Sequence, residues 1–88
     1  MLGIEHFTTL HMLYCSSNNL TTLDVSKNTA LEYLDCSYNR LTTLDVSKST
    51  DMWYLSCDFN QLTAIDVSKN LLSIPPIYPA LRNQPATQ

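Results

Sequence analysis

Hydrophobic and polar positions alternate in three short stretches of the chain, each of which ends in a cysteine. The stretches read MLYC, YLDC and YLSC, so that a leucine stands two residues before each cysteine. Alternation at every second residue is typical of a strand that buries only one of its faces. The pattern therefore predicts three strands with these side chains pointing inward: Leu13, Cys15, Leu34, Cys36, Leu55 and Cys57.

The three stretches belong to a repeat with a period of 21 residues. The pentapeptide LDVSK stands at 23–27 and at 44–48, and IDVSK follows at 65–69. Each unit has a first half, L-x-x-L-x-C-x-x-N, and a second half, L-x-x-L-x-V-x-x-N, in which Ser49 once replaces the asparagine. A fixed period of this length indicates a solenoid of stacked units. The full units are 10–30, 31–51 and 52–72.

The second halves carry an apolar stripe of their own, which also has to be buried. A flattened coil buries both stripes, because the second half can return as an extended run on the side opposite the strand. Stacked coils then pair their strands in parallel and in register, which leaves little or no α-helix. The further residues expected in the core are Leu10, Leu20, Leu23, Val25, Leu31, Leu41, Leu44, Val46, Met52, Leu62, Ile65 and Val67.

Each coil has to turn twice, although the three units contain neither glycine nor proline. Asparagine tolerates unusual backbone angles, and its side chain bonds nearby backbone groups. We therefore expect Asn18, Asn39 and Asn60 to form an internal ladder that satisfies the amides of the turns. Contact with a ligand or glycan is the alternative, and the place of these residues in the repeat motif disfavours it.

The repeat resembles the leucine-rich repeat, whose signature is L-x-x-L-x-L-x-x-N/C-x-L at about 20–29 residues per unit. The similarity is greatest to a nested bacterial subclass, with cysteine at the third apolar position of the first half and LDVSKN in the second. It covers residues 10–72. The resemblance implies a non-catalytic module of a large, repetitive bacterial protein that is secreted or lies on the cell surface.

The N-terminal residues 1–9 precede the first full unit. They contain the apolar residues Leu2, Ile4 and Phe7, and GIEHFTTL resembles the stretch that opens such arrays. Because a solenoid exposes its core at each end, terminal segments usually act as caps. We therefore expect residues 1–9 to form a partial coil or a minimal cap.

The C-terminal residues 73–88 contain all four prolines. Proline cannot donate a ladder hydrogen bond, so these residues are expected to end the sheet as a cap or tail. Residues 75–82 would then lie over the last coil, with Ile77 and Leu81 as a lid. The final residues 83–88 have no apolar anchor and are expected to be mobile.

Charge and hydropathy narrow the range of partners. Eight acidic and five basic residues give a net charge of −3 and a pI near 5.0, which argues against nucleic acid. No apolar run approaches the roughly 18 residues of a membrane helix, so membrane insertion is not expected. The start of the chain also lacks the regions of a secretory signal, so only the resemblance bears on location.

No pattern predicts a catalytic residue, a cofactor or a metal site. The cysteines recur once per unit at inward positions, not in the short pairs of zinc sites, and should be small buried hydrophobes. His6 and His11 belong to no catalytic motif. Asp24, Asp45 and Asp66 form a column for which calcium binding is an alternative, but the lysines nearby favour a solvated charged face.

The aromatic residues distinguish one face of the predicted solenoid. All of them except Phe7 and Tyr78 lie in the first halves at outward positions, whereas the second halves expose mainly Thr, Asp, Ser and Lys. Exposed tyrosine and tryptophan are frequent hot spots of binding interfaces. Cross-strand packing that only shields the sheet is the alternative, and near the turn it is favoured for Tyr38 and Phe59. The candidate partner-binding residues are Met12, Tyr14, Tyr33, Asp35, Trp53 and Tyr54, and other outward positions are His11, Glu32 and Ser56.

These observations predict a non-catalytic module that binds a protein or another ligand through its aromatic outward face. A protein and a surface glycan are both compatible partners, and the residues do not choose between them. The alternative is a structural fragment or spacer of a longer bacterial surface repeat protein, with no site of its own. Its exposed terminal coils would then associate end to end.

Overall fold

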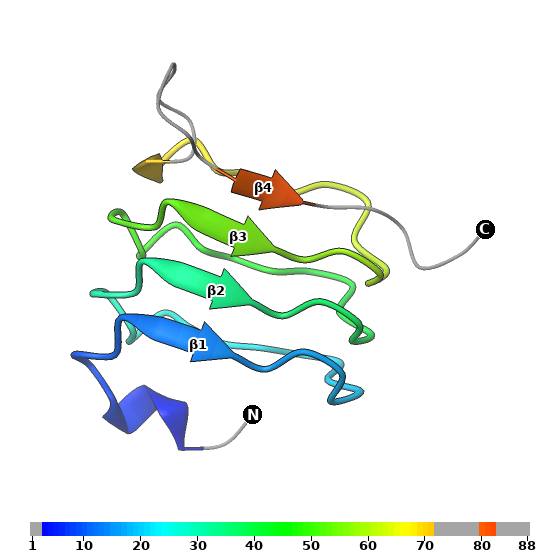
Figure 1. Cartoon of the computed structure of the whole chain (residues 1–88), viewed down its shortest axis with the longest axis horizontal. Coiled ribbons are helices and arrows are strands. Elements are labelled where there is room, and N and C mark those ends of the chain that lie inside the picture. Colours follow the sequence, from blue (N-terminus) through cyan, green and yellow to red (C-terminus); the bar gives the residue numbers. More distant parts are fainter. Residues whose placement is uncertain (1–2, 72–79, 83–88) are drawn as a thin grey trace.

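The computed structural model describes residues 3–71 and 80–82, which form one parallel sheet backed by loops (Figure 1). A short 3-10 turn, η1 (Ile4–His6), comes first. All the strands run in the same direction, as stacked coils require. The predicted parallel solenoid is therefore confirmed. In order across the sheet, the strands are β1 (Met12–Tyr14), β2 (Tyr33–Asp35), β3 (Tyr54–Ser56) and β4 (Ala80–Arg82).

Neighbouring strands are aligned residue for residue at the period of the repeat. Leu13 pairs with Leu34, and Leu34 pairs with Leu55. All three leucines are buried, and the cysteine that follows each of them is buried too. Along β1 the side chains are exposed, buried and exposed in turn, as the period-two pattern predicts.

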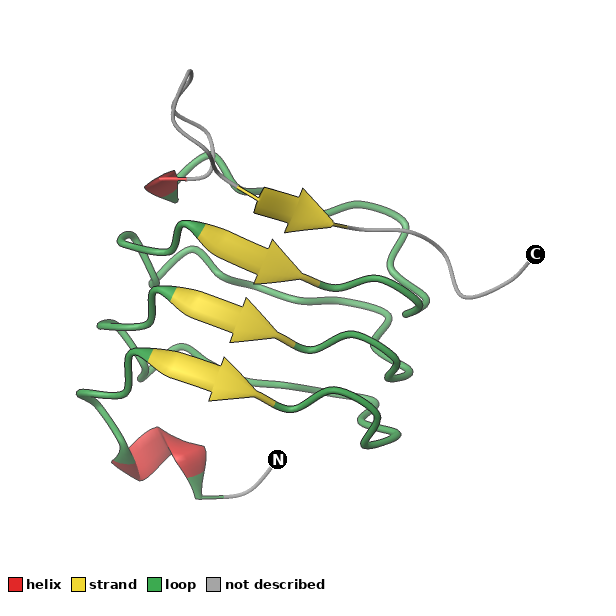
Figure 2. Ribbon diagram, in the orientation of Figure 1, coloured by secondary structure: helices red, strands yellow, loops and turns green. Residues whose placement is uncertain are grey.

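The second halves cross the back of the sheet and, within the described ranges, form no strand (Figure 2). Their apolar side chains still complete the core. Leu23, Val25, Leu41, Val46 and Leu62 are buried, and Leu20, Leu44, Ile65 and Val67 pack against them. The molecule is a slab of 33 × 31 × 16 Å. Its core is therefore one layer of side chains between the strands and the back segments.

The N-terminal turn has the same backbone hydrogen bonds as the back turns of the coils. Phe7 N donates to Ile4 O at 3.0 Å, and Asn28 N donates to Val25 O at 3.0 Å one period later. Asn28 Nδ2 also donates to the carbonyl oxygens of Ile4 at 2.8 Å and Phe7 at 3.1 Å, which joins η1 to the first coil. Ile4 is buried in the core, whereas Phe7 is 58% exposed. Leu2 lies outside the described residues.

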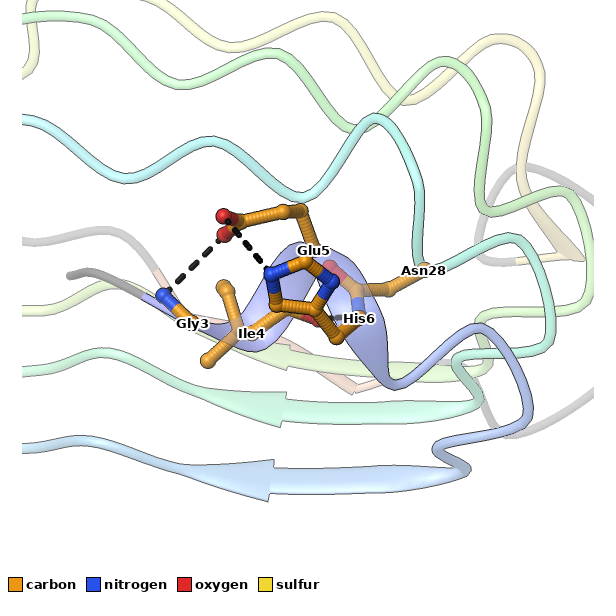
Figure 3. A network of polar contacts seen from close by, with 5 residues as sticks. All are labelled: Gly3, Ile4, Glu5, His6 and Asn28. Carbon is orange, nitrogen blue, oxygen red and sulfur yellow. Dashed lines mark hydrogen bonds and ion pairs between the residues drawn. The ribbon is translucent and has the colours of Figure 1, made fainter.

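Polar contacts close the start of η1 (Figure 3). Gly3 has a φ of 97°, which glycine adopts without steric cost. Its amide donates to Glu5 Oε1 at 3.1 Å, and Glu5 Oε2 lies 3.6 Å from His6 Nε2. His6 therefore belongs to the polar surface of this turn.

The expectation that the prolines end the sheet is wrong. Strand β4 pairs in parallel with β3, and Leu81 is aligned with Leu55. Residues 80–82 therefore extend the sheet and do not form a lid over the last coil. The physical reason is that Ala80, Leu81 and Arg82 all have a backbone N–H, so a ladder can form between Pro79 and Pro85. Ile77 and the tail 83–88 lie outside the described residues.

The turns after the strands do not place their left-handed residue where we expected it. Ser17, Tyr38 and Phe59 have φ angles of 60°, 57° and 58°, and each directly precedes one of the repeat asparagines. Asn19 is left-handed as well, with a φ of 55°. The asparagine of the motif therefore serves the turn through its side chain and not through an unusual backbone angle.

Candidate functional site

Four aromatic side chains form a continuous cluster on the outward side of β1 to β3. The rings of Tyr33 and Tyr54 are stacked, with centroids 4.1 Å apart and planes inclined by 5°. Tyr14 lies 5.0 Å from Tyr33. The ring of Trp53 is 5.8 Å from Tyr33 and 6.1 Å from Tyr54, in edge-to-face geometry. We use the name aromatic face for Met12, Tyr14, Tyr33, Asp35, Trp53 and Tyr54.

The register of the sheet explains this arrangement. Met12, Tyr33 and Tyr54 are aligned in one column, as the repeat spacing predicts. Strands in a sheet lie roughly 4.8 Å apart, which is close to the stacking distance of aromatic rings. Tyr14 stands two residues along from Met12, and Trp53 directly precedes β3. The structure thus brings residues from three coils into one surface.

The aromatic face is partly open to solvent. Its most exposed side chains are Tyr14 at 60%, Met12 at 48% and Trp53 at 41%. Tyr33, Asp35 and Tyr54 are half-buried. The stacked rings of Tyr33 and Tyr54 are therefore the less exposed part of the face, and Tyr14 and Trp53 are its more exposed rings.

Tyr33 occupies the centre of the cluster. Burial among its neighbours raises the pKa of Tyr33 to about 12, and a hydrogen bond with Tyr54 acts in the same direction. The nearby charge of Asp35 raises this pKa further. Tyr33 is therefore neutral at physiological pH and offers a hydroxyl group beside an apolar ring.

Two carboxylates border the rings. Glu32 Oε2 lies 3.2 Å from His11 Nδ1, and the Glu32 and His11 side chains are 43% and 62% exposed. Glu32 O accepts a hydrogen bond from Trp53 N at 2.9 Å, which places the two residues on adjacent coils. Asp35 Oδ1 accepts from Ser37 N at 3.1 Å and from Ser37 Oγ at 2.7 Å. The sequence predicts that His11 and Glu32 point outward. It does not predict their pairing, although their separation of 21 residues is a signal of it.

One residue in an outward column is not exposed. Ser56 follows the outward column of Tyr14 and Asp35, yet only 4% of its surface is exposed. Serine has the shortest side chain of that column, and β3 has a neighbouring strand on each side. Neighbouring groups therefore cover it, and Ser56 is not part of the accessible face.

A second aromatic pair lies at the turn beside the sheet. The rings of Tyr38 and Phe59 stack at 4.5 Å with planes inclined by 16°. Both residues have a left-handed backbone, which costs a residue with a large side chain about 1–2 kcal/mol. Stacking of this kind contributes about 0.5–1.5 kcal/mol and offsets part of that cost. Local packing therefore accounts for this pair.

The three cysteines are buried and have the thiol form. Burial raises the pKa of Cys15 to about 11 and that of Cys57 to about 12, and it raises the pKa of Cys36 as well. A thiol with a raised pKa stays neutral and is a poor nucleophile. The cysteines therefore pack as apolar side chains of the core.

The carboxylates of the acidic column on the back accept hydrogen bonds from amides of the turns. Asp24 Oδ1, Asp45 Oδ1 and Asp66 Oδ1 each accept a hydrogen bond at 2.9 Å from the amide two residues later. These hydrogen bonds lower the pKa of all three carboxyl groups. A shallow hollow lies there between the first two coils, lined by residues that include Thr22, Asp24, Thr43 and Asp45. In the described part of the chain, no group of three His, Cys, Asp or Glu side chains is placed to hold a metal ion.

The stacked units, the one-sided parallel sheet and the buried leucines and cysteines together define a leucine-rich repeat protein. A family model described as "Leucine Rich repeats (2 copies)" matches residues 8–49. Proteins of this family are typically non-catalytic binding modules. Within the described ranges, no helix is long and apolar enough to cross a membrane.

Among solved structures, the chain is similar to the functional domain of InlJ from Listeria monocytogenes. The TM-score is 0.78 and the sequence identity is 31%, over 98% of this chain and 23% of the InlJ chain. That domain is described as including a cysteine ladder. No curated protein sequence matches the chain. The resemblance to a bacterial leucine-rich repeat protein is thus confirmed.

Proposed function

We propose that the chain binds its partner through the aromatic face. The observation that carries this proposal is the continuous cluster of four rings on an open sheet, with Tyr14 and Trp53 at 60% and 41% exposure. Rigid aromatic side chains supply a large contact area at a low entropic cost, and they are frequent interface hot spots.

The placement of exposed apolar groups supports the same face. Of the six large hydrophobic residues that remain exposed in the described part of the chain, three belong to the aromatic face, namely Met12, Tyr14 and Trp53. The other three, Phe7, Tyr38 and Leu71, lie elsewhere. Contiguous apolar surface rimmed by polar groups often marks an interaction site. Packing that only shields the sheet would not need the exposed outer rings.

The proposed role is non-catalytic and uses no cofactor. Its partner is a protein or a surface glycan. The similarity to the InlJ domain supports a secreted or cell-surface location for a longer parent protein. It also supports assignment of the repeat to the nested bacterial subclass.

A second candidate function is that of a spacer within a longer repeat protein. Residues 4–10 reproduce the backbone bonds of a back turn, with Leu10 N donating to Phe7 O at 3.1 Å as Leu31 N donates to Asn28 O at 3.2 Å. A segment with the geometry of a coil is suited to stacking on another coil. This role would lead to end-to-end association of the terminal coils.

Binding of the double variant Tyr33→Ala, Tyr54→Ala to a panel of purified extracellular proteins and to a glycan array tests the proposal. We expect at least one specific partner of the unaltered chain, and at least a tenfold weaker signal for the variant. That loss corresponds to about 1.4 kcal/mol or more, which is typical of an aromatic hot spot. Unchanged binding would contradict the assignment of this face.

Tyr38→Asn is the matched control, because it removes an exposed ring outside the aromatic face and asparagine tolerates a left-handed backbone. Circular dichroism shows whether each variant is folded. Should the double variant unfold, the largely exposed Tyr14 can be changed to alanine in its place. Absence of any partner together with concentration-dependent sedimentation would favour the spacer role.

A further inference from the structure

Charge is distributed unequally between the two sides of the slab. Lys27, Lys48 and Lys69 are exposed on the back, where the exposed carboxylates of the second halves balance their charge. The carboxylates of Glu32 and Asp35 lie on the other side, next to the rings. Strands β1 to β3 contain no lysine or arginine. The aromatic face is therefore bordered by two carboxylates, with no lysine on its strands, and Glu32 Oε2 has His11 Nδ1 as a neighbour at 3.2 Å.

Arginine occurs at two places near the sheet. Arg40 follows the turn after β2, where its amide donates to Leu20 O at 2.7 Å. Arg82 belongs to β4, where it is aligned with Ser56 of β3. Strand β4 lies at the opposite edge of the sheet from β1. Glu32 and Asp35 belong to the coil of β2, which is the middle coil of the cluster, so the strand β3 lies between them and β4.

We infer that the segment bound by the aromatic face is cationic, a stretch of a protein partner that presents lysine or arginine side chains. The inference rests on the proposed function and specifies the chemistry of the partner. Its basis is the juxtaposition of exposed rings and partly exposed carboxylates on one face of the sheet.

The exposed rings provide the first half of this recognition. A guanidinium or ammonium group within roughly 6 Å of a ring centroid is attracted by the ring quadrupole, most strongly for tryptophan. Tyr33 and Tyr54 stack face to face at 4.1 Å, so part of their ring surface is occupied. Tyr14 and Trp53 are the more exposed rings and are therefore the ones available to a cation.

The carboxylates provide the second half. The Glu32 side chain is 43% exposed. The carbonyl oxygen of Glu32 accepts a hydrogen bond from Trp53 N on the next coil. Asp35 is held in place because its Oδ1 accepts two hydrogen bonds from Ser37. A carboxylate beside a ring reinforces cation binding, because an arginine can stack on the ring and donate to the carboxylate at the same time.

A glycan is a weaker fit to the same surface. A neutral sugar would stack on the rings but would gain nothing from the charge of Glu32 and Asp35. An acidic sugar would be repelled by both carboxylates. The charge pattern therefore favours a basic protein segment over either kind of glycan.

Titration of the full chain with a hexa-arginine peptide tests the inference, with the fluorescence of Trp53 as the readout. Trp53 is the only tryptophan in the chain and lies within the ring cluster. We expect a saturable change that weakens as salt is added, and no response to hexa-glutamate. Isothermal titration calorimetry repeats the measurement without relying on Trp53.

The variant pair Glu32→Gln, Asp35→Asn separates local charge from net charge. We expect it to weaken hexa-arginine binding about fivefold or more, as removal of two partly exposed ion-pair partners should. The matched control is Asp45→Asn, Asp66→Asn, which removes the same charge on the back and leaves an acceptor for each turn amide. We expect this control to weaken binding less than about twofold.

Two results would overturn the inference. The first is no binding of hexa-arginine, and the second is equal weakening by the two variant pairs, which would show an effect of net charge alone. A chitin oligosaccharide is titrated in parallel. If it binds in a manner that requires Tyr33 and Tyr54 but neither carboxylate, the proposed function survives and the cationic partner does not. If no probe or array partner depends on Tyr33 and Tyr54, both fail.

Discussion

At the scale of the residue, Asn39 shows how one side chain joins two coils. Its Oδ1 accepts from Asn18 N and Leu20 N at 2.9 Å each. Its Nδ2 donates to Cys15 O at 3.0 Å and to Cys36 O at 2.9 Å. Asn39 is buried, and so are its hydrogen bonds to the two cysteine carbonyl groups, which bulk water therefore cannot replace. The amide thus satisfies backbone groups of its own coil and of the preceding one.

Replacement of this amide should therefore be costly. We expect Asn39→Ala to lower the free energy of unfolding by about 3 kcal/mol, because it removes two part-buried and two buried hydrogen bonds to backbone groups at once. Urea denaturation followed by circular dichroism measures the change.

The matched control is Asn18→Ala. Asn18 is exposed on the first coil of the sheet, and its Nδ2 bonds only local carbonyl groups, those of Cys15 at 2.9 Å and Ser16 at 3.1 Å. Water can replace those bonds, so the expected loss is about 1 kcal/mol or less. Equal losses for the two variants would contradict a role of Asn39 between coils.

At the scale of the element, no strand is stable by itself. Strands β1 to β4 have three residues each, and η1 has three as well. Elements this short persist only through contacts with their neighbours, because their own hydrogen bonds cannot offset the loss of backbone entropy. Each coil is therefore stabilised by the coils that lie on either side of it.

The attachment of η1 provides a test at this scale. Asn28→Ala removes the two bonds that Nδ2 makes to Ile4 O and Phe7 O. We expect hydrogen exchange of the Phe7 and Leu10 amides to accelerate at least about tenfold, since a loss of 1.4 kcal/mol changes an opening equilibrium by that factor. Amide exchange measured by NMR reports each of these positions.

The internal reference is the Cys36 amide, which donates to Ser56 O at 2.9 Å in the middle of the sheet. Its exchange should change much less than that of Phe7. Acceleration of all three amides by the same factor would mean that Asn28 stabilises the whole molecule and does not hold η1 in particular.

At the scale of the whole molecule, the core is a layer that extends from coil to coil. The radius of gyration is 12.1 Å, which is about the value expected for a globular domain of this length. Three coils are thus as compact as an ordinary small domain. The column of Cys15, Cys36 and Cys57 runs through all of them, so its protonation state affects the entire stack.

Alkaline pH should therefore destabilise the protein. The thiol pKa of Cys15 rises from 9.0 to about 11 on folding, and those of Cys36 and Cys57 rise too. A raised pKa favours the protonated form in the folded state, so its stabilising contribution is complete below pH 9 and is lost as the pH rises to about 11. We expect the urea midpoint to be constant from about pH 7 to 8.5 and to fall above pH 9.

A variant with alanine at positions 15, 36 and 57, compared under reducing conditions, is the control for this pH profile. Its stability should fall less steeply between about pH 9 and 11, because it lacks the thiols. The contribution of Tyr33, whose pKa rises from 10.0 to about 12, remains in both proteins. Identical slopes would contradict the role given to the cysteines.

Much of this architecture follows from the amino-acid sequence. The period of 21 residues places equivalent side chains in equivalent positions, so the inward residues and the column of Met12, Tyr33 and Tyr54 are predictable. A repeated unit can bury its apolar stripes only against its neighbours, which makes the parallel stack the outcome of the repeat itself.

Only the tertiary structure decided the features that depend on what the neighbouring coil supplies. Strand β4 has no cysteine-type repeat signal and forms because the edge of β3 offers unpaired backbone groups. Ser56 is covered by its neighbours, and Tyr38 and Phe59 have a left-handed backbone beside each other's rings. The same holds for the stacking of Tyr33 on Tyr54 and the pairing of His11 with Glu32. The ring contacts and the His11–Glu32 pair join residues 21 positions apart, and β4 pairs with β3 at a separation of 26. All of them exist only once the coils have stacked.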